Sequence, residues 1–405
     1  MKINDGFLAQ MREATKLLQS DGPMAATAAI QRALHGATEG PVTSHQSDWV
    51  RFLPQIPELQ DVNTPHAYES DAQTTTTAPA GAHGKWTGAS ARQPVEDVEV
   101  IDTSNGNDEL TGKGRFISAT YSNPAGTRAY KLYIPSGYKG EALPMVVMLH
   151  GCTQNPDDFA VGTGMNALAE ENNCFVVYPA QAKGANGSHC WNWFQPGDQR
   201  RDHGEPSILA GITREIARTY KVDTSRIYIA GLSAGGAMAA VMAATYPELY
   251  AAIGIHSGLP YGVASDMPSA FAAMKRSKLK GGMSKMQPKA PQPFDEAVPA
   301  IIFHGDRDTT VHPVNGDQAF AQCVPMADEK DARIETQKET IPDGRTYTKT
   351  VVRNAQNNIV AEKWIIHGAG HAWSGGSNKG SYTDHNGPSA SAEMLRFFLT
   401  HRNTA

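Results

Sequence analysis

Gly231-Leu232-Ser233-Ala234-Gly235 is the stretch that decides the fold of this 405-residue chain. The apolar run Arg226–Ala230 precedes it and predicts a buried strand, and the alanine-rich run Gly236–Ala244 follows it and predicts a helix. The two flanking glycines leave room for a sharp strand-to-helix turn. This pattern is typical of a nucleophile elbow, where the serine stands at the strand end before the positive end of the helix. A plain glycine-rich turn is the alternative.

A nucleophilic serine requires a base, and the base requires an acid that orients it. The segment Val298–Val311 predicts an apolar strand that runs into a glycine turn with two aspartates. Asp308 fits the acid position at the end of such a strand, and Asp306 is the second candidate. The alternative is that both only stabilise the turn, because aspartate readily bonds to its own backbone there.

The base is expected in a glycine loop after the last strand. Trp364–Trp373 contains such a strand and loop, and His371 lies in the loop. The chain has 14 histidines, but His371 is the one with both this loop context and the order Ser, Asp, His. His256 follows the strand after the serine, and we expect it to line the pocket.

Two backbone N–H groups must stabilise the negative charge that develops on the attacked oxygen. One is expected from Ala234, the residue after the serine. The other is expected from the loop after the apolar strand Leu143–Leu149. Gly151 permits a tight turn in that loop, so the N–H of Cys152 is the first candidate for this oxyanion hole and that of Thr153 the alternative.

Five motifs in chain order resemble the poly(3-hydroxybutyrate) depolymerase family of esterases, which also contains feruloyl and acetyl-xylan esterase-like members. The resemblance covers roughly residues 115–402, and its motifs are His150–Gln154, Cys190–Phe194, Gly231–Gly235, His304–Asp308 and Gly370–Gly376. It implies catalytic roles for Ser233, Asp308 and His371, and an oxyanion-loop position for Cys152. It leaves the substrate open, because one fold hosts several ester specificities.

The resemblance also places Cys152 and Cys190 in loops near the expected site. A disulfide between them is therefore expected, unless the compartment is reducing. The chain has four cysteines and no C-x-x-C pair, which argues against a structural zinc site. No metal or other cofactor is expected.

Three tryptophans are candidates for lining the substrate pocket. Trp191 and Trp193 alternate, which would put them on opposite faces of an extended segment, with one at the site and one in the core. Trp373 follows His371 by two residues and would form a wall of the pocket. Only the family resemblance favours these roles over plain core packing.

Alternating strands and helices from residue 115 onward predict an α/β-hydrolase fold, with a mostly parallel sheet and helices on both faces. An antiparallel pair, Gly114–Tyr121 with Arg128–Pro135, should open the sheet. The further strands are expected at 145–149, 175–178, 226–230, 251–256, 299–304 and 360–367, and helices at 206–220 and 391–401.

Two segments are expected before the catalytic domain of residues 114–405, and a third within it. Residues 1–35 predict a short helical segment, and the polar, threonine-rich stretch within 36–113 predicts a flexible or loosely packed linker. The helical segment is a candidate for homo-oligomer or polyester-granule contact. Residues 265–298 predict a cap over the acyl pocket, with a solvated loop as the alternative.

Composition excludes several functions and favours a location. A formal charge of −5 and a pI near 6.3 give no basic footprint for nucleic acid. No apolar run approaches the roughly 18 residues of a membrane helix. The first residues have no apolar signal core, which favours the cytoplasm; secretion by a non-Sec route is the alternative.

These patterns together predict a serine carboxylesterase for short-chain esters, most of all 3-hydroxyalkanoate polyester or its oligomers. A feruloyl or acetyl-xylan esterase is the alternative within the same chemistry. From another class, a non-catalytic binding protein with a hydrolase fold is the alternative, although such proteins have usually lost a member of the triad and none is missing here.

Overall fold

The structure is a computed structural model that describes residues 114–275, 294, 298–324 and 332–403. All of these belong to one unit of the chain, Glu99–Ala405. The helical segment expected within 1–35 and the linker expected within 36–113 lie outside the described residues. So does most of the segment expected to form a cap.

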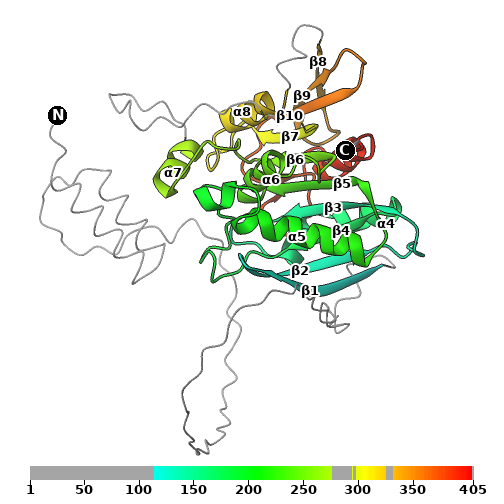
Figure 1. The fold of residues 1–405 in the computed structure, drawn as a ribbon. Helices are drawn as coiled ribbons and strands as arrows, with labels where there is room; N and C mark the ends of the chain where they lie inside the picture. The colour runs from blue at the N-terminus through cyan, green and yellow to red at the C-terminus, as the bar shows by residue number, and fades with distance from the viewer. Residues whose placement is uncertain (1–113, 276–293, 295–297, 325–331, 404–405) are drawn as a thin grey trace, which may run out of the picture. The chain divides into compact units, whose positions relative to one another are not determined.

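A ten-stranded sheet forms the centre of this unit, in the order β1-β2-β4-β3-β5-β6-β7-β10-β9-β8 (Figure 1). The strands are β1 Arg115–Asn123, β2 Gly126–Ile134, β3 Leu143–Leu149, β4 Phe175–Pro179, β5 Val222–Leu232, β6 Ala252–His256, β7 Ala300–Gly305, β8 Arg333–Thr340, β9 Thr346–Arg353 and β10 Ile359–Ile366. The six from β4 to β10 run parallel, and both ends of the sheet are antiparallel. The predicted fold class and the opening antiparallel pair are confirmed.

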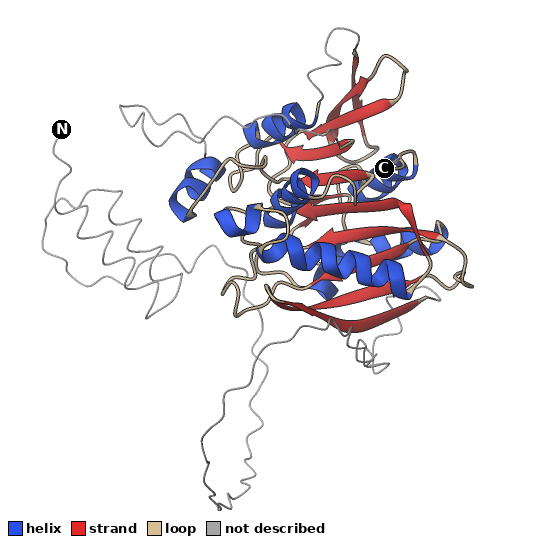
Figure 2. Cartoon of the chain, viewed as in Figure 1, coloured by secondary structure: helices blue, strands red, loops and turns tan. Residues whose placement is uncertain are grey.

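Helices cover both faces of the sheet (Figure 2). They are α3 Pro156–Thr163, α4 Met165–Glu171, α5 Gly204–Thr219, α6 Ala234–Thr245, α7 Met267–Lys275, α8 Val314–Cys323 and α9 Ala390–Leu399, with a 3-10 turn at Pro196–Gln199. In β5, Ile227 and Ile229 pack on the α5–α6 side, whereas Tyr228 and Ala230 pack on the α9 side. Strands buried on both faces explain the continuous apolar runs in the sequence.

The two helices predicted by residue range are confirmed within two residues at either end. The expected inward face of α5, which includes Ile208, Leu209 and Ile212, is buried. In α9, Met394 and Phe398 are buried as expected. An apolar stripe at helical spacing is thus a sufficient signal for both elements.

The hairpin of β8 and β9 at one edge of the sheet was not predicted from the sequence. Every residue of β8 is exposed, and Ile334 is its single large apolar side chain. A strand without a buried face carries no alternation of apolar and polar residues, so periodicity cannot reveal it.

No helix within the described ranges is long and apolar enough to cross a membrane.

The parallel strands place the predicted catalytic residues on one edge. Ser233 follows β5, Asp308 follows β7 and His371 follows β10. These strands belong to one parallel series, in which β6 joins β5 to β7 and β7 pairs with β10. Their carboxyl ends therefore meet at the same side of the sheet, where ligand sites form in such folds.

Candidate active site

Ser233 occupies a strained turn between β5 and α6. Its backbone has φ 57° and ψ −117°, a conformation that residues other than glycine rarely adopt. A Cβ on Gly235 would lie 2.1 Å from the Leu149 carbonyl oxygen, and one on Gly231 would lie 2.3 Å from the Gly235 carbonyl carbon. Only glycine fits at these two positions, which is the physical basis of the motif. The Ser233 N–H donates to the His256 carbonyl at 2.8 Å and holds the turn against β6.

The Ser233 hydroxyl makes no capping bond to α6. Its side chain is therefore not used to hold the helix end, and the residue keeps 9% of its surface exposed, against 1% for Leu232. The positive end of the helix lies behind it.

Asp308 lies against His371. Oδ2 of Asp308 is 2.6 Å from Nδ1 of His371, and the Asp308 side chain is fully buried. An ionised carboxylate only accepts, so Nδ1 carries the proton. This tautomer leaves Nε2 of His371 unprotonated and able to accept a proton.

The other oxygen of Asp308 is fixed by the turn that follows it. Oδ1 accepts the N–H groups of Thr310 and Val311, each at 2.8 Å. Nε2 of His304 lies 3.4 Å from Oδ2. Burial raises the pKa of Asp308, but the hydrogen bonds from His304 and His371, the charge of His371 and the Val311 N–H outweigh it, so the pKa lies well below its usual range. Asp308 is therefore ionised at neutral pH.

Asp306 has a different partner. Its Oδ2 lies 2.9 Å from Nδ1 of His367, and its Oδ1 accepts the Gly368 N–H at 2.7 Å. The structure thus brings Asp308, and not Asp306, to His371. His367 and Asp306 form a pair that is more exposed than the pair of His371 and Asp308, and it links the turn after β7 to the end of β10.

The loop after β3 contains two candidate oxyanion donors, the N–H groups of Cys152 and Thr153, and one of them already has an acceptor. The Thr153 N–H donates to the Ser188 carbonyl at 2.7 Å. The Cys152 N–H makes no such bond within the described residues, and the Ala234 N–H is among the first four of α6, which lack an acceptor inside the helix. Cys152 and Ala234 therefore remain the two candidate donors of the oxyanion hole.

His150 fixes the direction of the Cys152 N–H. Its Nε2 accepts the Gln181 N–H at 3.1 Å, so Nδ1 carries the proton and donates to the Gly151 carbonyl at 2.8 Å. In a trans peptide the carbonyl and the next N–H point in opposite directions. Burial lowers the pKa of His150 to about 4, so this neutral tautomer persists at neutral pH.

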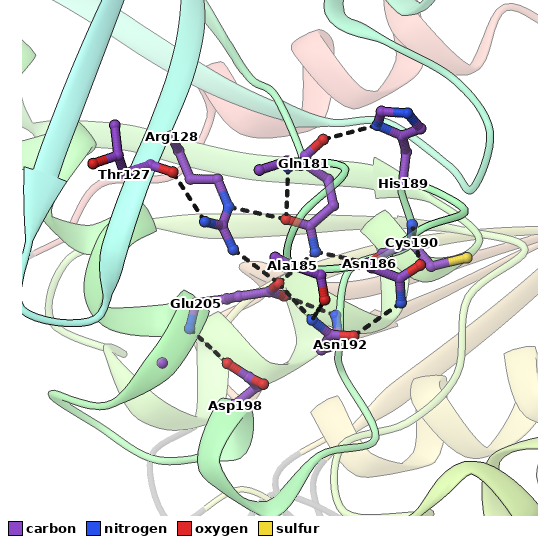
Figure 3. A network of polar contacts seen from close by, with 12 residues as sticks. Thr127, Arg128, Gln181, Ala185, Asn186, His189, Cys190, Asn192, Asp198 and Glu205 are labelled. Atoms are coloured by element: carbon purple, nitrogen blue, oxygen red, sulfur yellow. Dashed lines mark hydrogen bonds and ion pairs between the residues drawn. The ribbon is translucent and has the colours of Figure 1, made fainter. Parts of the chain in front are cut away.

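A buried polar network holds the neighbouring segment that contains Cys190 and Asn192 (Figure 3). Gln181 donates to the Cys190 carbonyl at 2.8 Å and to the carboxylate of Glu205, and it accepts from Arg128 at 2.9 Å. Glu205 also accepts the Asn192 N–H at 2.7 Å. Burial and the charge of Asp198 raise the pKa of Glu205 to about 7, against the bonds from Gln181 and Asn192 and the charge of Arg128.

Cys152 and Cys190 form a disulfide, with the two sulfurs 2.01 Å apart. This is the pairing that the family resemblance implied. It joins the residue with the candidate oxyanion N–H to the segment that Gln181 holds in place. Cys174 and Cys323 are buried free thiols.

The tryptophans proposed to line the pocket are buried in the core. Trp191 and Trp193 are 0% and 6% exposed and belong to the same apolar cluster. Because both are buried, neither offers the exposed surface that the predicted pocket lining requires. Trp373 is 1% exposed, and its indole N–H donates to Ser391 at 3.0 Å, so it offers no wall to a substrate.

His256 is also buried, with 1% of its surface exposed, which leaves it no surface to offer a substrate. Its Nε2 accepts the Ser374 N–H at 3.0 Å, and its ring stacks on Trp373 with centroids 5.0 Å apart. His256 therefore ties the loop that carries His371 to the strand beside Ser233. The sequence contained no signal for this contact, because the two residues are 118 positions apart.

Part of the expected cap is described. Met267–Lys275 within it form α7. The Met274 carbonyl accepts the N–H of His312, which precedes α8, and the Ala273 carbonyl accepts from the side-chain amide of Asn315 in α8. Residues 276–293 and 295–297 lie outside the described part.

No group of three or more His, Cys, Asp or Glu side chains is arranged to hold a metal ion within the residues described.

Comparison with known proteins assigns the family. The sequence pattern described as "Esterase PHB depolymerase" matches residues 128–340, more than half of the chain. Poly(3-hydroxyalkanoate) depolymerase C of Paucimonas lemoignei is 33% identical over 258 residues, 63% of this chain and 60% of that protein. The probable acetylxylan esterase A of Aspergillus fumigatus is 30% identical over 240 residues, 56% of this chain and 60% of that protein.

The chain thus spans about 60% of the length of these two relatives. Among solved structures, the acetyl xylan esterase from Aspergillus awamori matches 70% of this chain and 99% of its own, with a TM-score of 0.50 and 19% identity. That likeness concerns the fold, which is the one described above. The chain belongs to the family of esterases described as Esterase PHB depolymerase.

Proposed function

We propose that this chain is a serine carboxylesterase. Ser233 attacks the ester carbonyl, His371 Nε2 takes the serine proton and returns it to the leaving alcohol, and Asp308 holds the imidazole and stabilises its charged form. Water then hydrolyses the acyl-enzyme by the same proton transfers. The N–H groups of Cys152 and Ala234 stabilise the oxyanion.

The observation that carries this proposal is the 2.6 Å contact of Asp308 with His371, at the same sheet edge as the strained Ser233. It also opposes the alternative of a non-catalytic binding protein. A binding protein without catalytic activity does not require a serine with a strained positive φ between two glycines that tolerate no side chain. It does not require a buried carboxylate in contact with a loop histidine either.

For the substrate, we propose a 3-hydroxyalkanoate oligomer or amorphous polyester. The family and the depolymerase relative support this choice. Acetyl-xylan or feruloyl ester hydrolysis is the second candidate, which the similarity to an acetylxylan esterase supports. A panel separates them: 4-nitrophenyl esters from C2 to C8, methyl ferulate, acetylated xylan and 3-hydroxybutyrate oligomers. Hydroxybutyrate release at a kcat/KM below those for ferulate or acetyl-xylan would reject the proposed substrate.

A further part of the proposal concerns the roles of the residues before 114. We propose that residues 114–405 hold all the chemistry and that residues 1–35 mediate self-association or contact with polyester. Removal of residues 1–110 should leave the hydrolysis of 4-nitrophenyl acetate intact, with any change confined to light scattering or polymer binding. Loss of small-ester turnover in a folded truncation would reject this division.

The location is also a proposal. The cytoplasm was expected, but the Cys152–Cys190 disulfide favours the alternative of export to an oxidising compartment. Counting free thiols in protein isolated under native, alkylating conditions decides it: two free thiols support export, and four support the cytoplasm.

A further inference from the structure

Tyr382 stands exposed beside the candidate oxyanion loop. It is one of four large apolar side chains that the described residues leave exposed, at 48%. It lies on the loop that carries His371, where its carbonyl accepts the Trp373 N–H at 2.7 Å. This bond is continuous with the short pairing of β11 (Trp373–Ser374) and β12 (Thr383–Asp384).

The Tyr382 hydroxyl is fixed by Thr153, the residue after the candidate oxyanion donor. The two hydroxyl oxygens are 3.1 Å apart. Thr153 has one hydroxyl proton, which it donates to the Cys152 carbonyl. Tyr382 is therefore the donor to Thr153. The phenol thus bridges the loop of His371 and the loop of Cys152, and its polar end is occupied.

Both residues of this bridge have strained backbones. Tyr382 has φ 52° and Thr153 has φ 65°, in the left-handed region that disfavours aromatic and β-branched residues. Such strain persists only where the surroundings hold it, and it concentrates at functional sites. The neighbouring Ser381 provides the hold, because its N–H donates to Asp158 at 2.8 Å and its hydroxyl to the same carboxylate.

A fixed, half-exposed ring with an occupied hydroxyl offers one thing to a ligand, its apolar surface. An ester whose carbonyl oxygen reaches the Cys152 N–H comes next to Thr153, and so next to this ring. We propose that Tyr382 is a substrate-binding residue that packs against the aliphatic chain of the ester beyond the scissile group. The inference rests on the proposed esterase function and adds a contact that selects for chain length.

Aromatic surface gains free energy when a ligand covers it, in proportion to the apolar area removed from water. The expected effect of losing the ring is about a tenfold rise in KM for a long-chain ester. A two-carbon acyl group is too short to cover the ring, so the kcat/KM for an acetate should fall no further in Tyr382→Ala than in Tyr382→Phe, which loses only the hydroxyl bridge to Thr153.

The test compares four variants on 4-nitrophenyl acetate, 4-nitrophenyl octanoate and a 3-hydroxybutyrate trimer. Tyr382→Ala removes the ring, and Tyr382→Asn also removes it while tolerating positive φ, in case the alanine variant does not fold. Tyr382→Phe keeps the ring and loses only the hydroxyl. Ile334→Ala removes another exposed apolar side chain, on β8 at the sheet edge, as a matched control.

Support requires a KM rise for octanoate in Tyr382→Ala or Tyr382→Asn that clearly exceeds the change of the same variant on acetate. Ile334→Ala should show no KM rise on either ester. Tyr382→Phe should keep most of the octanoate affinity. An equal loss on acetate and octanoate would assign Tyr382 to support of the oxyanion loop, and an unchanged octanoate KM would assign it to the surface; either result overturns the inference.

The wild-type enzyme separates this inference from the proposed function. Wild-type turnover of the nitrophenyl esters without turnover of the trimer rejects the polyester substrate, while the comparison of acetate with octanoate still decides the role of Tyr382. A wild-type protein that hydrolyses none of the three esters rejects both.

Discussion

Nδ1 of His371 lies 2.6 Å from Oδ2 of Asp308, whereas Asp306, two residues earlier, is paired with His367. The two aspartates share one turn but differ in burial and in partner. The Asp308 side chain is fully buried, and that of Asp306 is 38% exposed. This difference favours Asp308 over Asp306 as the orienting acid of the proposed mechanism.

Replacement of the two aspartates by asparagine should therefore have unequal effects. Asp308→Asn favours the wrong imidazole tautomer and should lower kcat by roughly 10⁴-fold. Asp306→Asn should lower it by less than about tenfold, since it acts on the loop only. Steady-state hydrolysis of 4-nitrophenyl acetate measures both. A larger loss in Asp306→Asn would show that the acid has been misassigned.

The stability of the protein should depend on pH through His256. Burial lowers its pKa from 6.5 to about 3, and the neighbouring His304 and His371 act in the same direction. Between these values the unfolded chain binds one more proton at this side chain than the folded protein does. The free energy of unfolding contributed by His256 is thus fully present above pH 6.5 and is lost as the pH falls.

His256→Gln isolates this contribution, because glutamine can accept the Ser374 N–H without titrating. Urea unfolding from about pH 5 to about pH 7 should give a slope with pH that is smaller in the variant by up to ~1.4 kcal/mol per pH unit. Parallel pH dependences of wild type and variant would mean that His256 is not held neutral.

Loss of the disulfide should affect both stability and turnover. The double variant Cys152→Ala/Cys190→Ala keeps the Cys152 N–H but frees its loop. With a sequence separation of 38 residues, chain entropy predicts a loss of roughly 4 kcal/mol in the free energy of unfolding. The kcat for 4-nitrophenyl acetate should fall about tenfold, because a misplaced oxyanion donor costs transition-state stabilisation.

Cys323→Ala is the control for the disulfide variant, since it removes a buried free thiol away from this loop. It should leave kcat unchanged. A double variant with the kcat of the wild type would show that the network of His150 and Gln181 positions the loop without the disulfide.

The elbow glycines should tolerate no side chain. In Gly235→Ala the new Cβ would lie 2.1 Å from the Leu149 carbonyl oxygen, where neither backbone can move away. The variant should lose more than about 3 kcal/mol of stability, or fail to fold. Gly197→Ala is the matched control, because nothing lies within 4 Å of its Cβ. Thermal unfolding compares them, and equal melting temperatures would contradict the packing described for the elbow.

The sequence was sufficient for the buried strands of the sheet and for the loops that follow β5, β7 and β10. Buried strands such as β5 and β7 are continuous apolar runs, and the turns after them require glycine, so both leave a local pattern. The exposed β8 has no such pattern and was missed. The choice between Asp308 and Asp306 rested on motif spacing, and the contact with His371 gives the physical reason for it.

Contacts between segments that are far apart in the sequence could not be predicted from local sequence patterns. His256 and Ser374, or Tyr382 and Thr153, meet only because the parallel strands gather their loops at one edge. Trp191 and Trp373 were expected at the surface of the substrate pocket, but both are buried in the core. Their motif context suggested a pocket, but large aromatic side chains next to catalytic loops also serve to pack those loops.

The most direct test of the central claim is to locate the residue that a fluorophosphonate probe modifies, by peptide mass mapping of the inactivated protein. One adduct is expected, on Ser233, formed in step with the loss of 4-nitrophenyl acetate hydrolysis and absent from a folded Ser233→Ala variant. An adduct on another residue, or full hydrolytic activity in that variant, would contradict it.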